Sequence, residues 1–437
     1  MTLATIKQGM EWLYQQTANH PRLGLDAMHQ ALDYFNNPHL NLPVIHITGT
    51  NGKGSTTAFL SELFLAHDQK VVTLTSPHIM SFNERYQVNN QNIDDETLLM
   101  LLNKAKEYND YCLKKNQIPL STYEIITLLG ILFAAHIQPD VFIAEVGIGG
   151  LLDTTNVLNA QVAVITTIGL DHGDKLGDTL QEVAYQKAGI IKPSSQVVVG
   201  NIQGTPLSVI QQYAISKEAI VYKLDDDFYA TPIGQRMQWD YTFKNWYFKN
   251  LPCSLLGRHQ IDNAGVALTT FIAWMESRQQ RIDETAIRHS LATTHWMARM
   301  EKINDQPLIY LDGAHNAAGI QTLSDTLANY FPNKQVTLLF AGLDTKNQAE
   351  HLHLLAQLNP QSIYLTTLNH PYAMTLEQFE EILKDETIKF KKVHLTKDWQ
   401  AVIDDYLLNA HPAEDHLLLV TGSLYFVSDV RSYLTKK

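Results

Sequence analysis

The sequence predicts an α/β protein of two units, each with a mainly parallel sheet between helices. Short apolar runs rich in β-branched residues alternate with longer segments of helical spacing along the chain, and the alternation restarts after His295-Trp296. With 437 residues, the chain is also too long for one ordinary core. We expect a first unit of residues 1–297 and a smaller second unit of residues 298–437.

Five strands are expected in the first unit, because each is a short apolar run bounded by turn residues. They are Val44–Thr48, Val71–Thr75, Val141–Val146, Val162–Thr167 and Gln196–Val199. Helices are expected over Thr56–His67, Asp94–Lys115, Tyr123–His136 and about His259–Glu276. Trp239–Phe243 and Trp246–Phe248 flank Lys244-Asn245, which predicts a hairpin.

The second unit shows the same alternation. Its expected strands are Leu308–Leu311, Val336–Phe340, Ser362–Leu365 and Leu417–Thr421, separated by helices. This pattern is typical of a Rossmann-like α/β domain.

Composition narrows the class of protein. Apolar residues make up 45% and charged residues 18% of the chain, as in globular proteins. A net charge of −12 without a long basic run argues against nucleic acid or an anionic membrane as partner. Two cysteines, Cys112 and Cys253, make no disulfide framework and favour a cytoplasmic protein. Residues 1–16 lack a signal peptide's apolar core, and the apolar stretch Ile125–Ile137 is shorter than the ~20 residues of a membrane span.

A glycine-rich segment follows the first expected strand and precedes a helix. It reads Gly49-Thr50-Asn51-Gly52-Lys53-Gly54-Ser55-Thr56. This context turns backbone N–H groups and a helix N-terminus toward an anion. Lys53 would neutralise the β- and γ-phosphates of ATP, and Ser55 or Thr56 would offer a hydroxyl to Mg²⁺. Only two residues separate Gly49 from Gly52, so the strict P-loop spacing is not met. The alternative is a tight turn with an exposed lysine. We predict an N-terminal P-loop ATPase domain.

A second group of polar residues follows other expected strands. Glu145 lies at the end of Val141–Val146, His172 comes after Val162–Thr167, and Ser76 follows Val71–Thr75. Open parallel sheets bind ligands at this edge, where these donors suit a second Mg²⁺, although histidine is an unusual magnesium ligand. The alternatives are a capping serine, a glutamate paired with a lysine and a core histidine.

The segment Thr48–Ser55 resembles the loop of the Mur ligase superfamily, in the form that folylpolyglutamate and dihydrofolate synthases use. Further segments resemble that family in the same order, from about residue 20 to the C-terminus. They are Thr75–His78 with Phe82–Arg85, Glu145–Gly150 with Asp153–Asn156, Leu170–His172 with Leu176-Gly177, Asp312–Asn316 and Thr421–Tyr425. Two departures are Leu151-Leu152, where the family often has arginine, and Gly342–Asn347, where it commonly has Asp-Lys-Asp.

The resemblance implies roles for single residues. Ser76, Glu145 and His172 match the family's magnesium ligands. Lys187 matches a lysine that CO₂ carbamylates to support Mg²⁺, whereas from the residues alone it would be an ion-pair partner. Partial burial would lower the pKa of this lysine and make its neutral amine accessible.

Five residues farther along the chain are candidates for substrate contacts. Asn263 would pair with the adenine edge, with a helix-terminus hydrogen bond as the alternative. Arg299 matches an arginine that reaches phosphate, with a surface position as the alternative. Asp312 would accept from ribose hydroxyls. His315, expected to begin a helix, and Ser423 would hold the acyl phosphate or the amino acid, with N-caps as the alternative.

The resemblance also implies a reaction: the γ-carboxylate of a folate attacks ATP, and glutamate attacks the resulting acyl phosphate. Domain closure would bring Asp312 and His315 over the phosphate loop. We expect a monomer that acts on small molecules with ATP and with Mg²⁺ at two metal sites. The alternatives are addition of the first glutamate to dihydropteroate, a cell-wall precursor ligase, and a nucleotide-binding module without catalysis.

Overall fold

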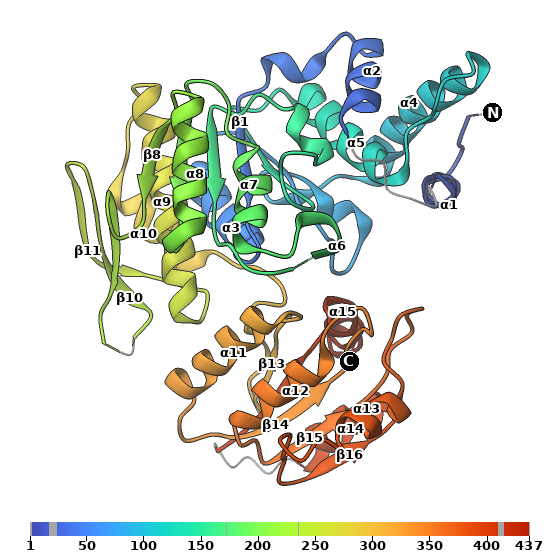
Figure 1. Ribbon diagram of the computed structural model, residues 1–437, viewed down its shortest axis with the longest axis vertical. Coiled ribbons are helices and arrows are strands. Elements are labelled where there is room, and N and C mark those ends of the chain that lie inside the picture. The colour runs from blue at the N-terminus through green and yellow to red at the C-terminus, as the bar shows by residue number, and fades with distance from the viewer. Residues whose placement is uncertain (1, 17–23, 172, 235, 410–414, 437) are drawn as a thin grey trace. The chain divides into compact units, whose positions relative to one another are not determined.

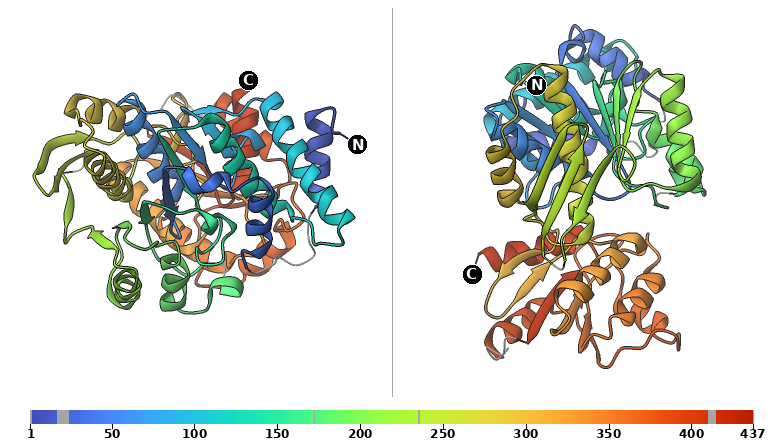
Figure 2. Two further views of the ribbon diagram at one scale, coloured as in Figure 1. Left: turned by 90° about the horizontal axis from the view of Figure 1, so that it is seen from above. Right: turned by 90° about the vertical axis from the view of Figure 1, so that its left-hand side faces the viewer.

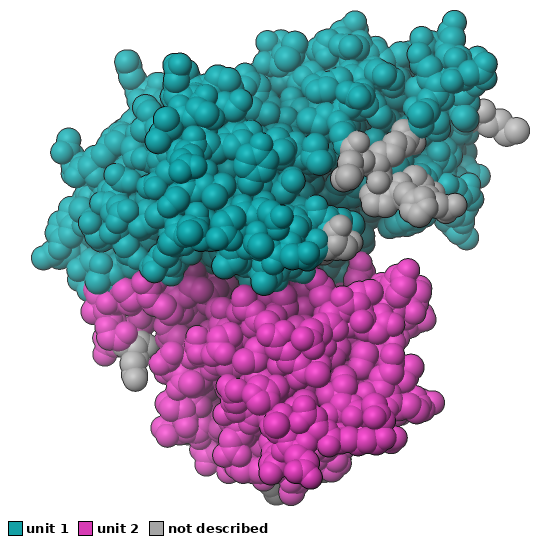
Figure 3. Space-filling model, in the orientation of Figure 1, with its two compact units in different colours: residues 1–231, 239–252, 262–294 teal, residues 232–238, 253–261, 295–437 magenta. Residues whose placement is uncertain are grey.

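The computed structural model describes residues 2–16, 24–171, 173–234, 236–409 and 415–436. It contains two compact units, coloured separately in Figure 3. The first comprises residues 1–231, 239–252 and 262–294, and the second comprises residues 232–238, 253–261 and 295–437. The α/β class predicted from the alternation of strands and helices is confirmed in both units.

The first unit is built on an eight-stranded sheet in the order β4-β3-β2-β5-β1-β6-β7-β8. Figure 1 labels β1 and β8 of this sheet. Neighbouring strands from β2 to β8 pair in parallel, whereas β3 and β4 are antiparallel. The strands are β1 Val44–Thr48, β2 Val71–Leu74, β3 Tyr86–Val88, β4 Gln91–Asn92, β5 Val141–Glu145, β6 Val162–Ile165, β7 Gln196–Val199 and β8 Ile220–Lys223. Every residue of β1 and β5 is buried, which agrees with their continuous apolar runs.

Helices cover both faces of this sheet (Figure 2). Residues of α4 and α5 form one core cluster with β1, β2 and β5, and residues of α7 and α8 form another with β6 and β7. The helices are α1 Ile6–Gln15, α2 Asp26–Tyr34, α3 Lys53–Leu65, α4 Asp95–Lys114, α5 Thr122–Ile137, α6 Gly173–Leu176, α7 Leu180–Ala188, α8 Gly204–Ser216, α9 Arg258–Ser277 and α10 Glu284–Thr293. Of the helices in the described residues, none has both the length and the apolarity that a membrane span requires.

A small three-stranded sheet has the order β11-β10-β9. Its strands are β9 Phe228–Pro232, β10 Gln238–Phe243 and β11 Trp246–Pro252. The predicted turn at Lys244-Asn245 joins β10 to β11, and Lys244 has the positive φ of 51° that such tight connections use.

The second unit has a six-stranded sheet in the order β12-β13-β17-β14-β15-β16. Only β12 is antiparallel to its neighbour among the pairs described. The strands are β12 Glu301–Asn304, β13 Ile309–Leu311, β14 Gln335–Phe340, β15 Ser362–Leu365, β16 Val393–Leu395 and β17 His416–Thr421. The helices are α11 Ala317–Tyr330, α12 Gln348–Gln357, α13 Leu376–Ile382, α14 Trp399–Asn409 and α15 Leu424–Thr435.

Candidate functional site

The glycine-rich segment forms the predicted connection between a strand and a helix. β1 ends at Thr48 and α3 begins at Lys53, so the phosphate loop spans Gly49 to Gly52. Gly52 occupies the N-cap position with a φ of +90°, a conformation that glycine adopts without strain. A Cβ atom on Gly52 would lie 2.5 Å from Oδ1 of Asn263, so the Asn263 side chain packs directly on this loop.

The Lys53 ammonium lies over the loop itself. Its Nζ atom donates to the carbonyl oxygens of Gly49 at 2.9 Å and Thr50 at 3.4 Å. Ser55 and Thr56 are buried in the first turn of α3. The Thr56 N–H donates to the Gly52 carbonyl at 2.9 Å, whereas the N–H groups that precede it in the helix have no carbonyl partner within the helix. The loop therefore combines a cation, helix N-terminal amides and hydroxyls in one place, as an anion site requires.

Ser76 and Glu145 meet at the carboxyl ends of the paired strands β2 and β5. The backbone N–H of Ser76 donates to Oε2 of Glu145 at 3.1 Å. Glu145 is buried, and a carboxylate and a serine hydroxyl are oxygen ligands of the kind that suit Mg²⁺. The third predicted ligand, His172, lies outside the described residues.

Lys187 is buried near the end of α7. Burial lowers the pKa of its amine to about 7, Lys53 acts in the same direction, and Asp171 and Asp153 oppose the change. The positive charge of Lys53 therefore contributes to the lowered pKa of Lys187. A lysine with a pKa of about 7 is about half neutral at neutral pH, and the neutral amine is the form that reacts with CO₂.

Asp153 is a buried residue whose role at the site was not predicted individually. One carboxylate oxygen accepts from the Ile148 N–H at 3.0 Å and the Tyr123 hydroxyl at 3.2 Å, and the other accepts from the Thr155 N–H at 2.9 Å. Burial raises the pKa of Asp153, and these hydrogen bonds oppose the rise. The only sequence signal was its place after the Gly149-Gly150 pair. Asp153 therefore fixes the loop that follows β5.

In the second unit, Asp312 organises the turn that carries Arg299. Its carboxylate accepts from the N–H groups of Met300 at 2.8 Å and Ala314 at 2.9 Å. Ala298 and Met300, on either side of Arg299, have positive φ angles of 56° and 43°. A Cβ atom on Gly313 would lie 2.6 Å from Nη1 of Arg299, so the guanidinium lies beside the 312–316 segment. Burial raises the pKa of Asp312, and Arg299 opposes this rise.

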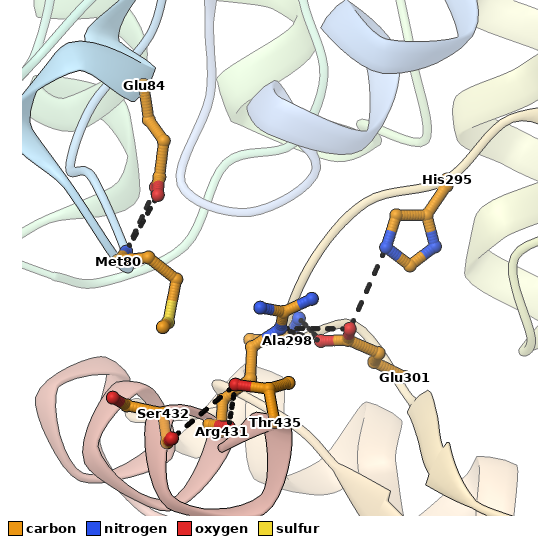
Figure 4. A network of polar contacts seen from close by, with 8 residues as sticks. All are labelled: Met80, Glu84, His295, Ala298, Glu301, Arg431, Ser432 and Thr435. Atoms are coloured by element: carbon orange, nitrogen blue, oxygen red, sulfur yellow. Dashed lines mark hydrogen bonds and ion pairs between the residues drawn. The ribbon is translucent and has the colours of Figure 1, made fainter.

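Glu301 fastens the same turn to α15, as Figure 4 shows. Its carboxylate accepts from the Ala298 N–H and from Nε of Arg431, each at 3.0 Å. His295 Nε2 lies 3.7 Å from the same group. In the first unit, Glu84 holds Met80 in a similar way, because its carboxylate accepts from the Met80 N–H at 2.9 Å (Figure 4).

His315 and Ser423 complete the predicted residues of the second unit. His315 does not begin the helix: α11 starts at Ala317, and the side chain of Asn316 caps it by accepting from the Gly319 N–H at 2.8 Å. Nδ1 of His315 instead contacts the Gly313 carbonyl at 2.8 Å. Ser423 occupies the N-cap position of α15, but its side chain makes no capping hydrogen bond. The capping alternative therefore explains neither side chain.

Comparisons with known proteins agree with this geometry. Residues 47–271 match the model of the Mur ligase middle domain, and residues 298–424 match that of the Mur ligase, glutamate ligase domain. The chain is 31% identical over 435 residues to dihydrofolate synthase/folylpolyglutamate synthase of Bacillus subtilis, covering 97% of each protein. It is 32% identical to folylpolyglutamate synthase of Lacticaseibacillus casei, covering 96% of this chain and 95% of that one. The structure of Mycobacterium tuberculosis folylpolyglutamate synthase complexed with ADP matches with a TM-score of 0.87 at 25% identity, covering 99% and 98%.

Proposed function

Because the chain belongs to the Mur ligase family, among the dihydrofolate and folylpolyglutamate synthases, we propose that it is an ATP-dependent ligase that adds L-glutamate to the γ-carboxylate of a (tetrahydro)folate. The observation that carries the proposal is the Lys53 ammonium over the loop that follows β1, with the buried Glu145 carboxylate at the end of the paired strand β5. We also propose residues 1–297 as the ATP-binding domain and residues 298–437 as the ligase domain on the glutamate and acyl-phosphate side.

The reaction needs activation because a carboxylate is a poor electrophile. The folate γ-carboxylate attacks the γ-phosphorus of ATP, which forms an acyl phosphate and releases ADP. The glutamate amine then attacks the acyl carbon, and phosphate leaves. Most of the catalysis is positioning and stabilisation of charge. Lys53 and the first-turn amides of α3 hold the triphosphate, and Asn263 lies beside the loop for the adenine.

Ser55, Ser76, Glu145 and His172 are proposed to hold Mg²⁺, which reduces repulsion between the carboxylate and the triphosphate when it is bound. Ser76 and Glu145 suit this role because both residues carry oxygen ligands and they meet at one sheet edge, where the Ser76 N–H donates to the Glu145 carboxylate. Arg299, Asp312, His315 and Ser423 are proposed to act on the phosphate, the ribose and the incoming glutamate. The hydrogen bond from the Met300 N–H to Asp312 and the positive φ angles beside Arg299 support the proposed role of Arg299, because they fix the turn that carries its guanidinium.

A second activity, addition of the first glutamate to dihydropteroate, is favoured by one observation. The Bacillus subtilis relative carries both activities in its name. Assays with each acceptor and labelled glutamate, followed by mass spectrometry of the products, will separate the two activities.

Omission of single substrates tests the proposed function. Phosphate release is expected only when ATP, Mg²⁺, glutamate and a folate or pteroate acceptor are all present, with one glutamate added to the acceptor. Binding of ATP without phosphate release in the complete mixture would instead identify a nucleotide-binding module. Phosphate release with no change in acceptor mass would contradict the ligase assignment.

Lys187 is proposed to act as a carbamate formed from CO₂. The neutral fraction of its amine rises as the pH rises through about 7, so carbamylation is expected to increase over the same range. Removing bicarbonate should lower activity by about tenfold or more, as loss of a group that supports a metal does. Mass spectrometry will detect the modification, and Lys187→Met should have low activity that bicarbonate does not change. A fully active protein with unmodified Lys187 would refute the role.

A further inference from the structure

Hydrogen bonds join the phosphate loop to residues 166–169, the segment that follows β6. β6 pairs with β1, and Thr48 lies opposite Ile165. Beyond the two strands the pairing continues, because the Thr166 N–H donates to the Thr48 carbonyl at 2.9 Å and the Thr50 N–H donates to the Thr167 carbonyl at 3.0 Å. The loop therefore runs alongside residues 166–169.

Threonine hydroxyls complete this connection. Oγ1 of Thr166 donates to the Asn51 carbonyl at 2.6 Å, and Oγ1 of Thr167 accepts from the Asn51 N–H at 3.0 Å. From the loop side, Oγ1 of Thr50 donates to the Gly169 carbonyl at 3.0 Å and accepts from the Gly169 N–H at 2.9 Å. The N–H and carbonyl groups of Asn51 and the hydroxyl of Thr50 therefore all form hydrogen bonds with residues 166–169.

The contact is also close. A Cβ atom on Gly49 would lie 1.8 Å from Oγ1 of Thr166, so this position has no room for a side chain. Thr166 is buried, and it leaves the loop little freedom to move away from β6. Because the N–H groups of Thr50 and Asn51 face residues 166–169, the phosphates would be met by the amides that begin α3.

We propose that Thr50, Thr166 and Thr167 are positioning residues that hold the phosphate loop in the shape that receives the ATP triphosphate. Thr50 acts through Gly169 and does not itself contact the nucleotide. The inference rests on the proposed function, because it takes ATP as the ligand of the loop. A loop already ordered in this shape loses less conformational freedom when ATP binds.

Replacing the hydroxyl of Thr167 by a methyl group tests the proposal. Thr167→Val removes, with little change in shape, both the acceptor of the Asn51 N–H and a donor to the Asn51 carbonyl. The carbonyl keeps the hydrogen bond from the Thr166 hydroxyl, so the N–H is the group that loses its partner in this segment. We expect KM for ATP to rise about five- to tenfold, the effect of one buried hydrogen bond, and the Kd of the ATP analogue AMPPCP to rise in parallel. KM for glutamate and for the folate should stay within about twofold of the wild-type value, because the loop affects the nucleotide alone. Thr167→Ser keeps the hydroxyl and should restore ATP affinity.

Thr73→Val is the matched control. Thr73 is a buried threonine of β2 in the same sheet, and within the described part of the chain its hydroxyl has no hydrogen-bond partner. This variant should keep the wild-type KM for ATP. Thermal unfolding of all variants will separate a local effect from general destabilisation. Unchanged ATP affinity in Thr167→Val, or an equal rise in KM for all substrates, would overturn the proposal.

Failure of the proposed function gives a different result. A wild-type protein that binds AMPPCP but releases no folate-dependent phosphate would contradict the ligase assignment, while the AMPPCP measurements would still test the threonines. A wild-type protein that does not bind AMPPCP would overturn both.

Discussion

Lys53→Ala is expected to lower folate-dependent ADP formation by about a thousandfold, because charge stabilisation in a site shielded from water is worth several kcal/mol. The variant loses the cation proposed to face the β- and γ-phosphates. It also loses the hydrogen bonds from Nζ to the Gly49 and Thr50 carbonyls. Both kcat and the affinity for AMPPCP should fall. A coupled assay for ADP and a binding titration will measure the two effects.

The pH dependence of Lys187 provides a second measurement on the same variant. Since Lys53 contributes to the lowered pKa of Lys187, its removal should raise that pKa and move the bicarbonate dependence to higher pH. Lys70→Ala, at an exposed lysine of the same unit, is the control and should retain wild-type activity. Wild-type ADP formation by Lys53→Ala would refute the assignment of the loop.

Glu145→Gln is expected to lower kcat about a hundredfold and to raise the Mg²⁺ concentration needed for half-maximal activity. Glutamine keeps an oxygen that accepts from the Ser76 N–H, so the strand ends should remain in place while the negative charge is lost. Titration of activity with Mg²⁺ at saturating ATP will show both effects.

Glu62→Gln is the control for Glu145→Gln. Glu62 is a partly buried glutamate of α3 that accepts from the Asn90 amide, and its replacement should leave the Mg²⁺ requirement unchanged. An unchanged Mg²⁺ requirement in Glu145→Gln would remove Glu145 from the proposed ligands.

The central strands were predictable because strands buried on both faces are continuous apolar runs. β1 and β7 have the predicted bounds. Edge strands were missed for the opposite reason: β4 is two exposed polar residues, and two of the three residues of β16 are exposed. The order β2-β5-β1-β6 depends on packing between distant segments, which the local pattern does not contain.

The site was predictable where chemistry leaves a pattern in the sequence. Strand ends followed by glycine, lysine, serine or glutamate identified Lys53, Ser76 and Glu145 as neighbours of one sheet edge. The supporting residues leave no such pattern. Thr166 and Thr167 are ordinary threonines until the pairing of β6 with β1 places them against Asn51. The start of α11 was misplaced by two residues, because Asn316 is a better N-cap than His315.

The two left-handed residues on either side of Arg299 have a consequence for ligand affinity. Alanine and methionine rarely take such angles, each at a cost of about 1–3 kcal/mol, and here Asp312 and Glu301 hold them. The free energy of folding therefore holds the Arg299 guanidinium in position before the proposed phosphate ligand binds. A relaxed turn should raise the free energy of unfolding and lower the affinity for the proposed phosphate ligand. Stability and ligand affinity therefore oppose each other at Ala298 and Met300.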